Sequence, residues 1–278
     1  MSAARPLRRR SAATAAYPLT RDDAEHARLE TQAAFWAADA AALFDSVPLA
    51  GGWRVADLGC GTLHVAQAMA ARVGARGNVL ALDTDAALVE RLQSAPLPPP
   101  LQLRCADAFA TGLPAQSLDA AHARFVAAPC GRLEALLGEM LRIVRPGGWI
   151  LLQEPVADSW SVPAAGDAWA TLKRLIHAGF ETRGGHFDAG ARLAPALARA
   201  PLCDLRVREV VHVLPTPHPY ARLPLQFARS LRPLWRASGL ASDDEIDAIV
   251  AEVERALTRA GQVRTFMLVQ AWARVTAP

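Results

Sequence analysis

The hydrophobic and polar positions of residues 22–47 follow a helical period. Apolar side chains recur there at alternating steps of three and four, which places them on one face of a helix. These positions are Leu29, Ala33, Trp36, Ala40, Leu43 and Val47. Thr20, Asp22 and Asp23 supply N-cap oxygens, and Pro48 follows the last apolar position. The pattern predicts one long amphipathic helix.

From residue 54 to residue 153, short apolar runs alternate with helical segments. The runs predict strands over residues 54–58, 78–83, 101–106, 118–126 and 149–153. The segments between them predict helices over residues 63–73, 86–93 and 132–144. Strands separated by helices of this size form a parallel sheet with helices on both faces.

The last third of the chain has a different pattern. Apolar positions at Trp169, Leu172, Leu175, Ile176 and Phe180 mark one face of a helix. Residues 205–214 and 262–275 are rich in β-branched side chains and partly alternating, so we expect two strands. Helical stretches near 225–235 and 243–257 lie between them. We therefore expect a closing, hairpin-like pair of strands with helical insertions.

Composition narrows the class of protein. The chain has 278 residues, of which 52% are hydrophobic, and 30 basic residues oppose 27 acidic ones. So apolar a chain is not disordered throughout, and a net charge of +3 does not favour nucleic-acid binding. No apolar run reaches the roughly 18 residues needed to span a bilayer. The four cysteines form no C-x-x-C pair, and the histidines lack metal-site spacing, so we expect no disulfide, no metal and a cytoplasmic location.

The first sixteen residues carry Arg5, Arg8, Arg9 and Arg10 and no acidic residue. We interpret residues 1–16 as a disordered basic tail, and an organelle transit peptide is the alternative. We expect an N-terminal cap helix over residues 17–48 and a main domain over residues 49–278, with lid insertions near 156–200 and 215–260.

The first predicted strand leads directly into a glycine-rich turn, Asp57-Leu-Gly-Cys-Gly-Thr62. Gly59 and Gly61 permit positive φ and let a ligand approach the backbone. The following helix start directs N–H groups into the same crevice. Asp83 ends the second strand, where a carboxylate can bind a ribose diol, and Asp107-Ala108 follow the third strand, where a base would lie.

Together these segments resemble the class I S-adenosylmethionine-dependent methyltransferases, over about Val55 to Pro155. The matching segments, in order, are Val55-Ala-Asp-Leu-Gly-Cys-Gly-Thr62, Leu82-Asp-Thr-Asp85, Ala106-Asp-Ala108 with Leu113-Pro114, Leu118-Asp-Ala-Ala121 and Arg145-Pro-Gly-Gly148. The resemblance implies a Rossmann-like, doubly wound α/β fold. Its seven-stranded sheet is mostly parallel with an antiparallel last strand, and an N-terminal helical cap and lid helices accompany it.

The closest resemblance is to the small-molecule branch, which includes quinone C-methyltransferases and natural-product methyltransferases. Similar segments are Tyr17-x-Leu19, Glu25-x-x-Arg28-Leu29-x-x-Gln32, Arg124-Phe125, Gln153-Glu-Pro155 and Ala271-Trp-Ala-Arg274. The resemblance implies S-adenosylmethionine as cofactor, S-adenosylhomocysteine as product, and methyl transfer to a small, largely apolar or aromatic molecule. We expect no nucleic-acid partner and a monomer or homodimer.

Candidate site residues follow from the motifs and the resemblance. The cofactor-binding candidates are Tyr17, Gln32, Asp57, Gly59, Cys60, Gly61, Asp83, Thr84, Asp107, Ala108 and Arg124. Arg124 could equally pair with a structural acid. The substrate-binding candidates are Phe180, Phe187, Tyr220, Phe227 and Trp235. His186 and Glu154 are the candidates for a catalytic base, and we expect His122 to be a packed strand residue.

One position departs from the family pattern. Leu63 stands where the family has a third glycine, and a side chain there could narrow the pocket. This keeps a second function open, in which the chain binds the cofactor without methyl transfer, as a scaffold, partner subunit or non-methylating catalyst. A nicotinamide dehydrogenase is less favoured because the downstream segments match methyltransferases.

Overall fold

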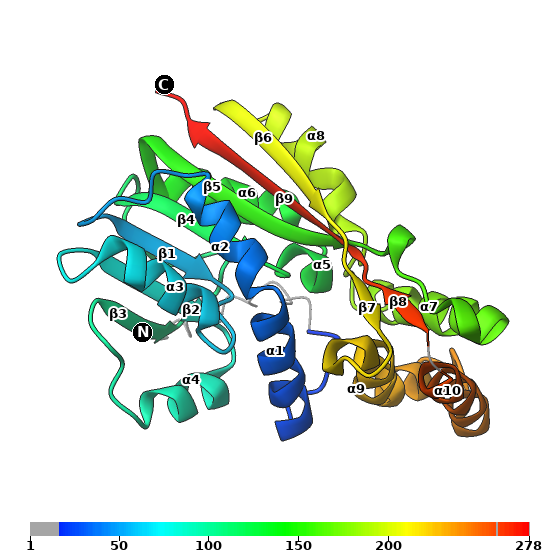
Figure 1. Ribbon diagram of the computed structural model, residues 1–278. Coiled ribbons are helices and arrows are strands. Elements are labelled where there is room, and N and C mark those ends of the chain that lie inside the picture. Colours follow the sequence, from blue (N-terminus) through cyan, green and yellow to red (C-terminus); the bar gives the residue numbers. More distant parts are fainter. Residues whose placement is uncertain (1–16, 260, 278) are drawn as a thin grey trace, which may run out of the picture.

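A seven-stranded sheet forms the centre of the molecule (Figure 1). The structure is a computed structural model that describes residues 17–259 and 261–277, so the predicted tail over 1–16 lies outside the described residues. The strands are β1 (Arg54–Leu58), β2 (Asn78–Asp83), β3 (Leu101–Cys105), β4 (Leu118–Arg124), β5 (Val144–Val156), β6 (Leu202–Val210) and β9 (Met267–Val275), in the order β3-β2-β1-β4-β5-β9-β6. Strands β1 to β5 are parallel, and β9 is antiparallel to both of its neighbours. The predicted topology is confirmed.

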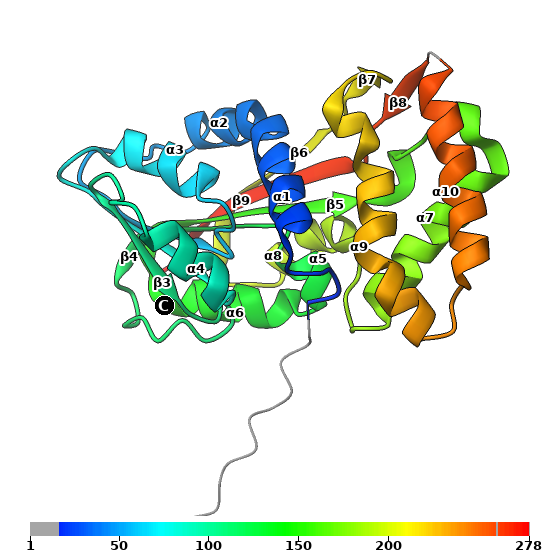
Figure 2. The same ribbon diagram turned by 90° about the horizontal axis from the view of Figure 1, so that it is seen from below.

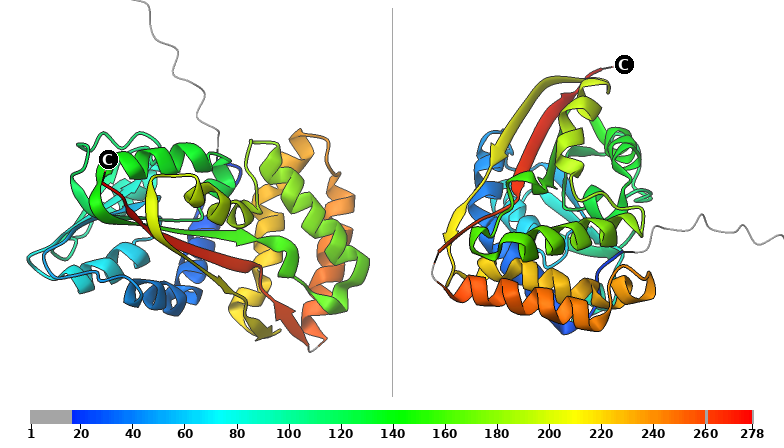
Figure 3. Two further views of the ribbon diagram at one scale, coloured as in Figure 1. Left: turned by 90° about the horizontal axis from the view of Figure 1, so that it is seen from above. Right: turned by 90° about the vertical axis from the view of Figure 1, so that its right-hand side faces the viewer.

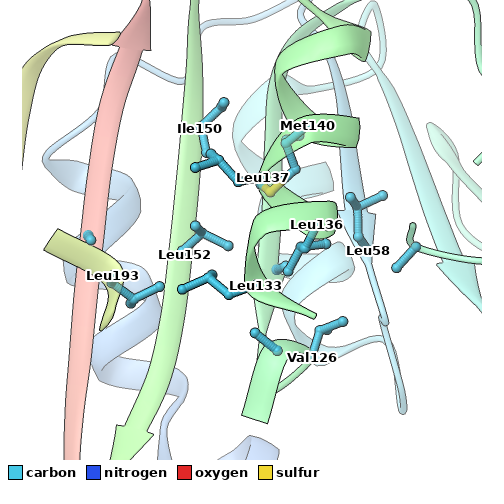
Figure 4. Packing of buried hydrophobic residues seen from close by; sticks show 14 of the residues in the cluster. Leu58, Val126, Leu133, Leu136, Leu137, Met140, Ile150, Leu152 and Leu193 are labelled. Atoms are coloured by element: carbon cyan, nitrogen blue, oxygen red, sulfur yellow. The ribbon is translucent and has the colours of Figure 1, made fainter. Parts of the chain in front are cut away.

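Helices cover both faces of the sheet (Figure 2). On one face, α2 (Ala37–Asp45), α3 (His64–Val73) and α4 (Ala86–Gln93) contribute to a core that contains Phe44, Met69 and Val89. On the other face, α6 (Leu133–Ile143) packs Leu133, Leu136 and Met140 against the strands, and α8 (Leu193–Ala198) lies beside it (Figure 4). A sheet buried on both faces explains why its strands are apolar runs.

The N-terminal helix bends, whereas the sequence pattern predicted a continuous helix. Asp22 caps the backbone N–H of Glu25 and starts α1 (Asp23–Phe35), and α2 begins after Trp36. The Trp36 side chain is fully buried, and its indole N–H donates to the Tyr220 hydroxyl at 2.7 Å. This long-range anchor fixes the bend, so that α2 lies on the sheet while α1 extends past its carboxyl edge (Figure 2).

The two last predicted strands are each interrupted. After β6 the chain continues into β7 (Val213–Pro215), and β8 (Gln262–Arg264) precedes β9; β7 and β8 pair as a separate antiparallel ribbon. The break is held by Thr265, whose hydroxyl accepts from the backbone N–H of His212 and whose own N–H donates to the His212 carbonyl. The closing pair is confirmed, with a bend that the pattern did not predict.

Three helices form a layer of their own at one end of the sheet (Figure 3). These are α7 (Gly166–Glu181), α9 (Leu223–Ala237) and α10 (Asp243–Thr258), and they share an aromatic core that also includes Trp36 and Phe266. The short helix α5 (Ala127–Cys130) contacts α6 and β5. Among the described residues, no helix combines the length and hydrophobicity that a membrane span requires.

Candidate active site

The glycine-rich turn has the conformation that the sequence predicted. Backbone N–H groups of Gly59 and Cys60 donate to the Leu82 carbonyl, and both glycines of the turn have positive φ, +69° at Gly59 and +50° at Gly61. A Cβ on Gly59 would lie 2.5 Å from the Val126 side chain, so packing requires that glycine. A Cβ on Gly61 would meet no atom within 4 Å, because this residue borders the open cavity.

Asp57 lines the cavity, and its two carboxylate oxygens differ in their partners. Its Oδ1 lies 2.8 Å from Nδ1 of His122. Its Oδ2 is buried, and no group in residues 17–259 or 261–277 forms a hydrogen bond with it. A buried acceptor without a partner is costly, so this oxygen is suited to a donor on a bound ligand.

Asp83 stands at the carboxyl end of β2. Its two oxygens accept from the backbone N–H groups of Gly61 at 3.0 Å and Asp85 at 2.9 Å, which fixes the carboxylate against the glycine turn. Burial raises the pKa of this carboxyl group. Thr84, Asp107 and Ala108 complete the wall beside it. Each carboxylate oxygen retains lone pairs for a ligand hydroxyl.

Helix α1 closes the cavity from the other side. Arg28 is buried and forms a two-bond ion pair with Glu25, and it also donates to Oε1 of Gln32 at 2.6 Å. The Tyr17 hydroxyl donates to the same Glu25 at 3.1 Å. Because these side chains satisfy one another, the cap presents a fixed polar surface to the cavity.

Arg124 was predicted either to face the ligand or to pair with a structural acid. It lines the cavity, and its guanidinium lies 3.5 Å from the Trp36 carbonyl. No carboxylate of the described residues lies within ion-pair distance of it. Burial lowers the pKa of this group, so an anionic ligand group would stabilise its charged form.

The opposite end of the cavity is aromatic. The cavity encloses about 200 Å³, and five phenylalanines line this end. They are Phe125, Phe180, Phe187, Phe227 and Phe266. Their rings meet edge to face, with Phe187 and Phe227 centroids 5.7 Å apart, and Arg28 lies 5.0 Å from the Phe227 ring centre. One cavity thus joins a carboxylate-rich end to an apolar end.

Every cofactor-binding candidate lines this cavity, as do Phe180, Phe187 and Phe227. Four other candidates lie outside the lining formed by the described residues. Glu154 is fully buried, and its carboxylate accepts three backbone N–H groups, those of residues 126–128 at the start of α5. The backbone N–H of His186 donates to the carbonyl oxygen of Ala128. Tyr220 and Trp235 are buried in the helical core. Their predicted roles stay predictions.

Leu63 points away from the cavity. Its backbone takes the left-handed conformation, with φ +69°, that the family's glycine would adopt readily. Its side chain is 2% exposed and packs with Phe44, Val65 and Met69 in the core beside α3. Leu63 is not among the residues that line the cavity described above, so it does not narrow the pocket.

Residues 56–152 match the family model described as a methyltransferase domain. This chain carries a methyltransferase domain. The match ends within β5, so it covers the glycine turn, Asp83 and Asp107. The resemblance seen in the motifs is confirmed. No curated protein has a sequence similar enough to match the chain.

Solved structures share the fold of this methyltransferase domain and of its surrounding helices. The geranyl diphosphate C-methyltransferase of Streptomyces coelicolor, solved with S-adenosylhomocysteine, is 18% identical, with a TM-score of 0.53 over 86% of this chain and 79% of that one. A geranyl diphosphate methyltransferase solved with S-adenosylmethionine is 20% identical, with a TM-score of 0.53 over 95% and 94%. The [4+2]-cyclase SpnF is 20% identical, with a TM-score of 0.51 over 87% and 82%.

Two aromatic residues of the cavity, Phe125 and Phe266, are not among the site residues predicted from the sequence. Phe266 reaches the cavity from the bend between β8 and β9, which no local pattern reveals. Phe125 has φ +57°, an uncommon conformation for a bulky residue, and lines the cavity just after β4. His122 lies behind the cavity lining, and its place inside an apolar strand did indicate a buried polar contact, because a buried imidazole needs hydrogen-bond partners.

Proposed function

We propose that this methyltransferase domain binds S-adenosylmethionine and transfers its methyl group to a small, largely apolar or aromatic molecule. The observation that carries the proposal is the single cavity with two chemically different ends. When bound, the cofactor supplies an activated methyl group on a positively charged sulfur. A role in natural-product metabolism is part of the proposal and is supported by the fold shared with geranyl diphosphate methyltransferases.

The carboxylate-rich end suits the cofactor. Oδ2 of Asp57 would accept from the ammonium group of the methionine portion, which removes an unsatisfied buried acceptor. Arg124 would face the carboxylate group, Asp83 would accept from the ribose hydroxyls, and Asp107 with Ala108 would flank the adenine. The open space before Gly61 permits this close approach to the backbone.

The aromatic end suits the acceptor. Phe180, Phe187 and Phe227 exclude water and hold an apolar molecule next to the methyl group, so alignment supplies much of the catalysis. Glu154 is occupied by three backbone N–H groups. Neither Glu154 nor His186 is among the described residues that line the cavity, so we assign to neither of them the proton that a methylated acceptor releases.

Transfer of an isotope-labelled methyl group tests the function. The protein is incubated with trideuteromethyl S-adenosylmethionine and a metabolite extract, and the small-molecule and macromolecular fractions are analysed by mass spectrometry. We expect label in an organic-extractable small molecule, and none with Gly61→Val. Cofactor binding without any labelled product would instead support the non-methylating function, for which the fold of a cyclase is the precedent.

A further inference from the structure

Five polar side chains lie in a row across one face of the sheet, one each from β1, β4, β5, β9 and β6. In that order they are Asp57, His122, Gln153, Gln270 and Arg208. The first four are buried, between 0% and 2% exposed, and Arg208 is half-buried at the edge strand. Helix α2 covers the row, and its Phe44 ring lies 5.5 Å from the His122 ring.

Hydrogen bonds connect all five side chains into one chain, called here the polar row. Arg208 Nε donates to Oε1 of Gln270 at 2.7 Å, and Gln270 Nε2 lies 2.7 Å from Oε1 of Gln153. Gln153 Nε2 lies 2.7 Å from Nε2 of His122, whose Nδ1 lies 2.8 Å from Oδ1 of Asp57. Arg208 and Gln270 also donate to the Asp39 carbonyl, each at 3.0 Å.

The direction of these bonds follows from Arg208 and from the Asp39 carbonyl. A guanidinium only donates and a carbonyl only accepts, so Gln270 must present its oxygen to Arg208 and its NH₂ group to Asp39 and Gln153. Gln153 must then present its oxygen to Gln270 and its NH₂ group to His122. An NH₂ group needs an acceptor, so Nε2 of His122 carries no hydrogen and Nδ1 donates to Asp57.

We infer that Arg208, Gln270 and Gln153 are positioning residues that fix His122 as the Nδ1–H tautomer and so hold Asp57 with Oδ2 free for a cationic ligand group. The functional part of this inference rests on the proposed cofactor site. Removing the guanidinium leaves Oε1 of Gln270 without its charged donor, so that only the Asp39 carbonyl still opposes rotation of the two amides. When they rotate, His122 carries its hydrogen on Nε2. Nδ1 and Oδ1 of Asp57 would then both be acceptors, and the carboxylate would turn from the cavity. The charge of Arg124, which lines the same cavity, interacts with those of Asp57 and Asp39.

The imidazole ¹⁵N shifts of His122, assigned with His122→Gln, report the tautomer directly, and calorimetry with S-adenosylhomocysteine reports the site. Arg208→Met removes the terminal donor. Arg206→Met is the matched control, because Arg206 lies on the same strand and is exposed. Arg208→Lys retains a donor that cannot accept. All three changes lie on an edge strand, and thermal unfolding checks that each variant folds.

We expect the Nδ1–H tautomer in the wild type, Arg206→Met and Arg208→Lys. Arg208→Met should show Nε2–H or exchanging signals and at least about threefold weaker binding, which lies within the range of coupling between connected side chains. An Nε2–H tautomer in the wild type, or an Arg208→Met variant that matches Arg206→Met in both measurements, overturns the inference. If the wild type binds no S-adenosylhomocysteine, the proposed function fails, and the ¹⁵N shifts still decide whether Arg208 sets the tautomer.

Discussion

Replacing Asp83 with alanine removes the carboxylate that we assign to the ribose. The side chain is mostly buried at the end of β2 and already accepts from the backbone N–H groups of Gly61 and Asp85. Two ribose hydroxyls would add two charge-assisted hydrogen bonds, each worth about 1.5–3 kcal/mol. Because the freed hydroxyls regain bonds to water, we expect a net loss of at least about 1.4 kcal/mol, which is tenfold in affinity.

Calorimetric titration with S-adenosylhomocysteine measures this loss. Asp119→Ala is the matched control, because Asp119 also holds a backbone N–H, that of Arg54 at 2.7 Å, and lies outside the cavity lining described here. The control should bind within about twofold of the wild type, a difference of about 0.4 kcal/mol. Unchanged affinity in a folded Asp83→Ala protein, with binding intact in the wild type, would refute the ribose assignment.

Three further predictions concern the turn, the acceptor end and the stability. Gly61→Val should abolish cofactor binding, measured by calorimetry. Gly112 has a similar positive φ but is exposed and lies outside the cavity lining, so Gly112→Val should retain binding. An equal loss of affinity in both variants would point to backbone strain alone. Phe227→Leu should raise the KM for the acceptor while cofactor affinity changes less than about threefold, and Trp235→Phe, outside the lining, should leave that KM unaltered. Burial raises the pKa of Glu154 from 4.5 to about 7, so the folded protein keeps a proton that the unfolded chain releases. The free energy of unfolding should then fall by up to about 3 kcal/mol as the pH rises from 4.5 to about 7. Urea titrations at several pH values measure this dependence, and Glu154→Gln should make the free energy of unfolding depend less on pH. A variant with the same pH dependence as the wild type would refute this.

The sheet and the cofactor end of the cavity were predictable because their signals are local. The turn from Asp57 to Thr62 and the strand ends at Asp83 and Asp107 each follow from short patterns whose geometry the parallel sheet fixes. The aromatic end depends on contacts between distant segments, because Phe266 reaches it from a bend after β8. Tyr220 lies outside the lining because its hydroxyl accepts from the buried indole of Trp36, a contact that no local pattern reveals.

Other features depend on pairing across strands. The glutamines of the polar row are unremarkable in sequence, and only the register of β5, β9 and β6 places them side by side with Arg208. For Leu63, by contrast, the sequence pattern suggested an effect on the site that the structure does not show. Its sequence position indicated a narrowed pocket, but the left-handed backbone directs the side chain into the core.

A crystal structure of the protein with S-adenosylhomocysteine would show where the cofactor binds and in which orientation. We expect the ribose hydroxyls on Asp83, the ammonium group on Oδ2 of Asp57, the adenine beside Asp107, and the sulfur directed toward the phenylalanines. Ligand bound outside this cavity, or inside it with the adenine among the phenylalanines, would overturn the proposed cofactor site.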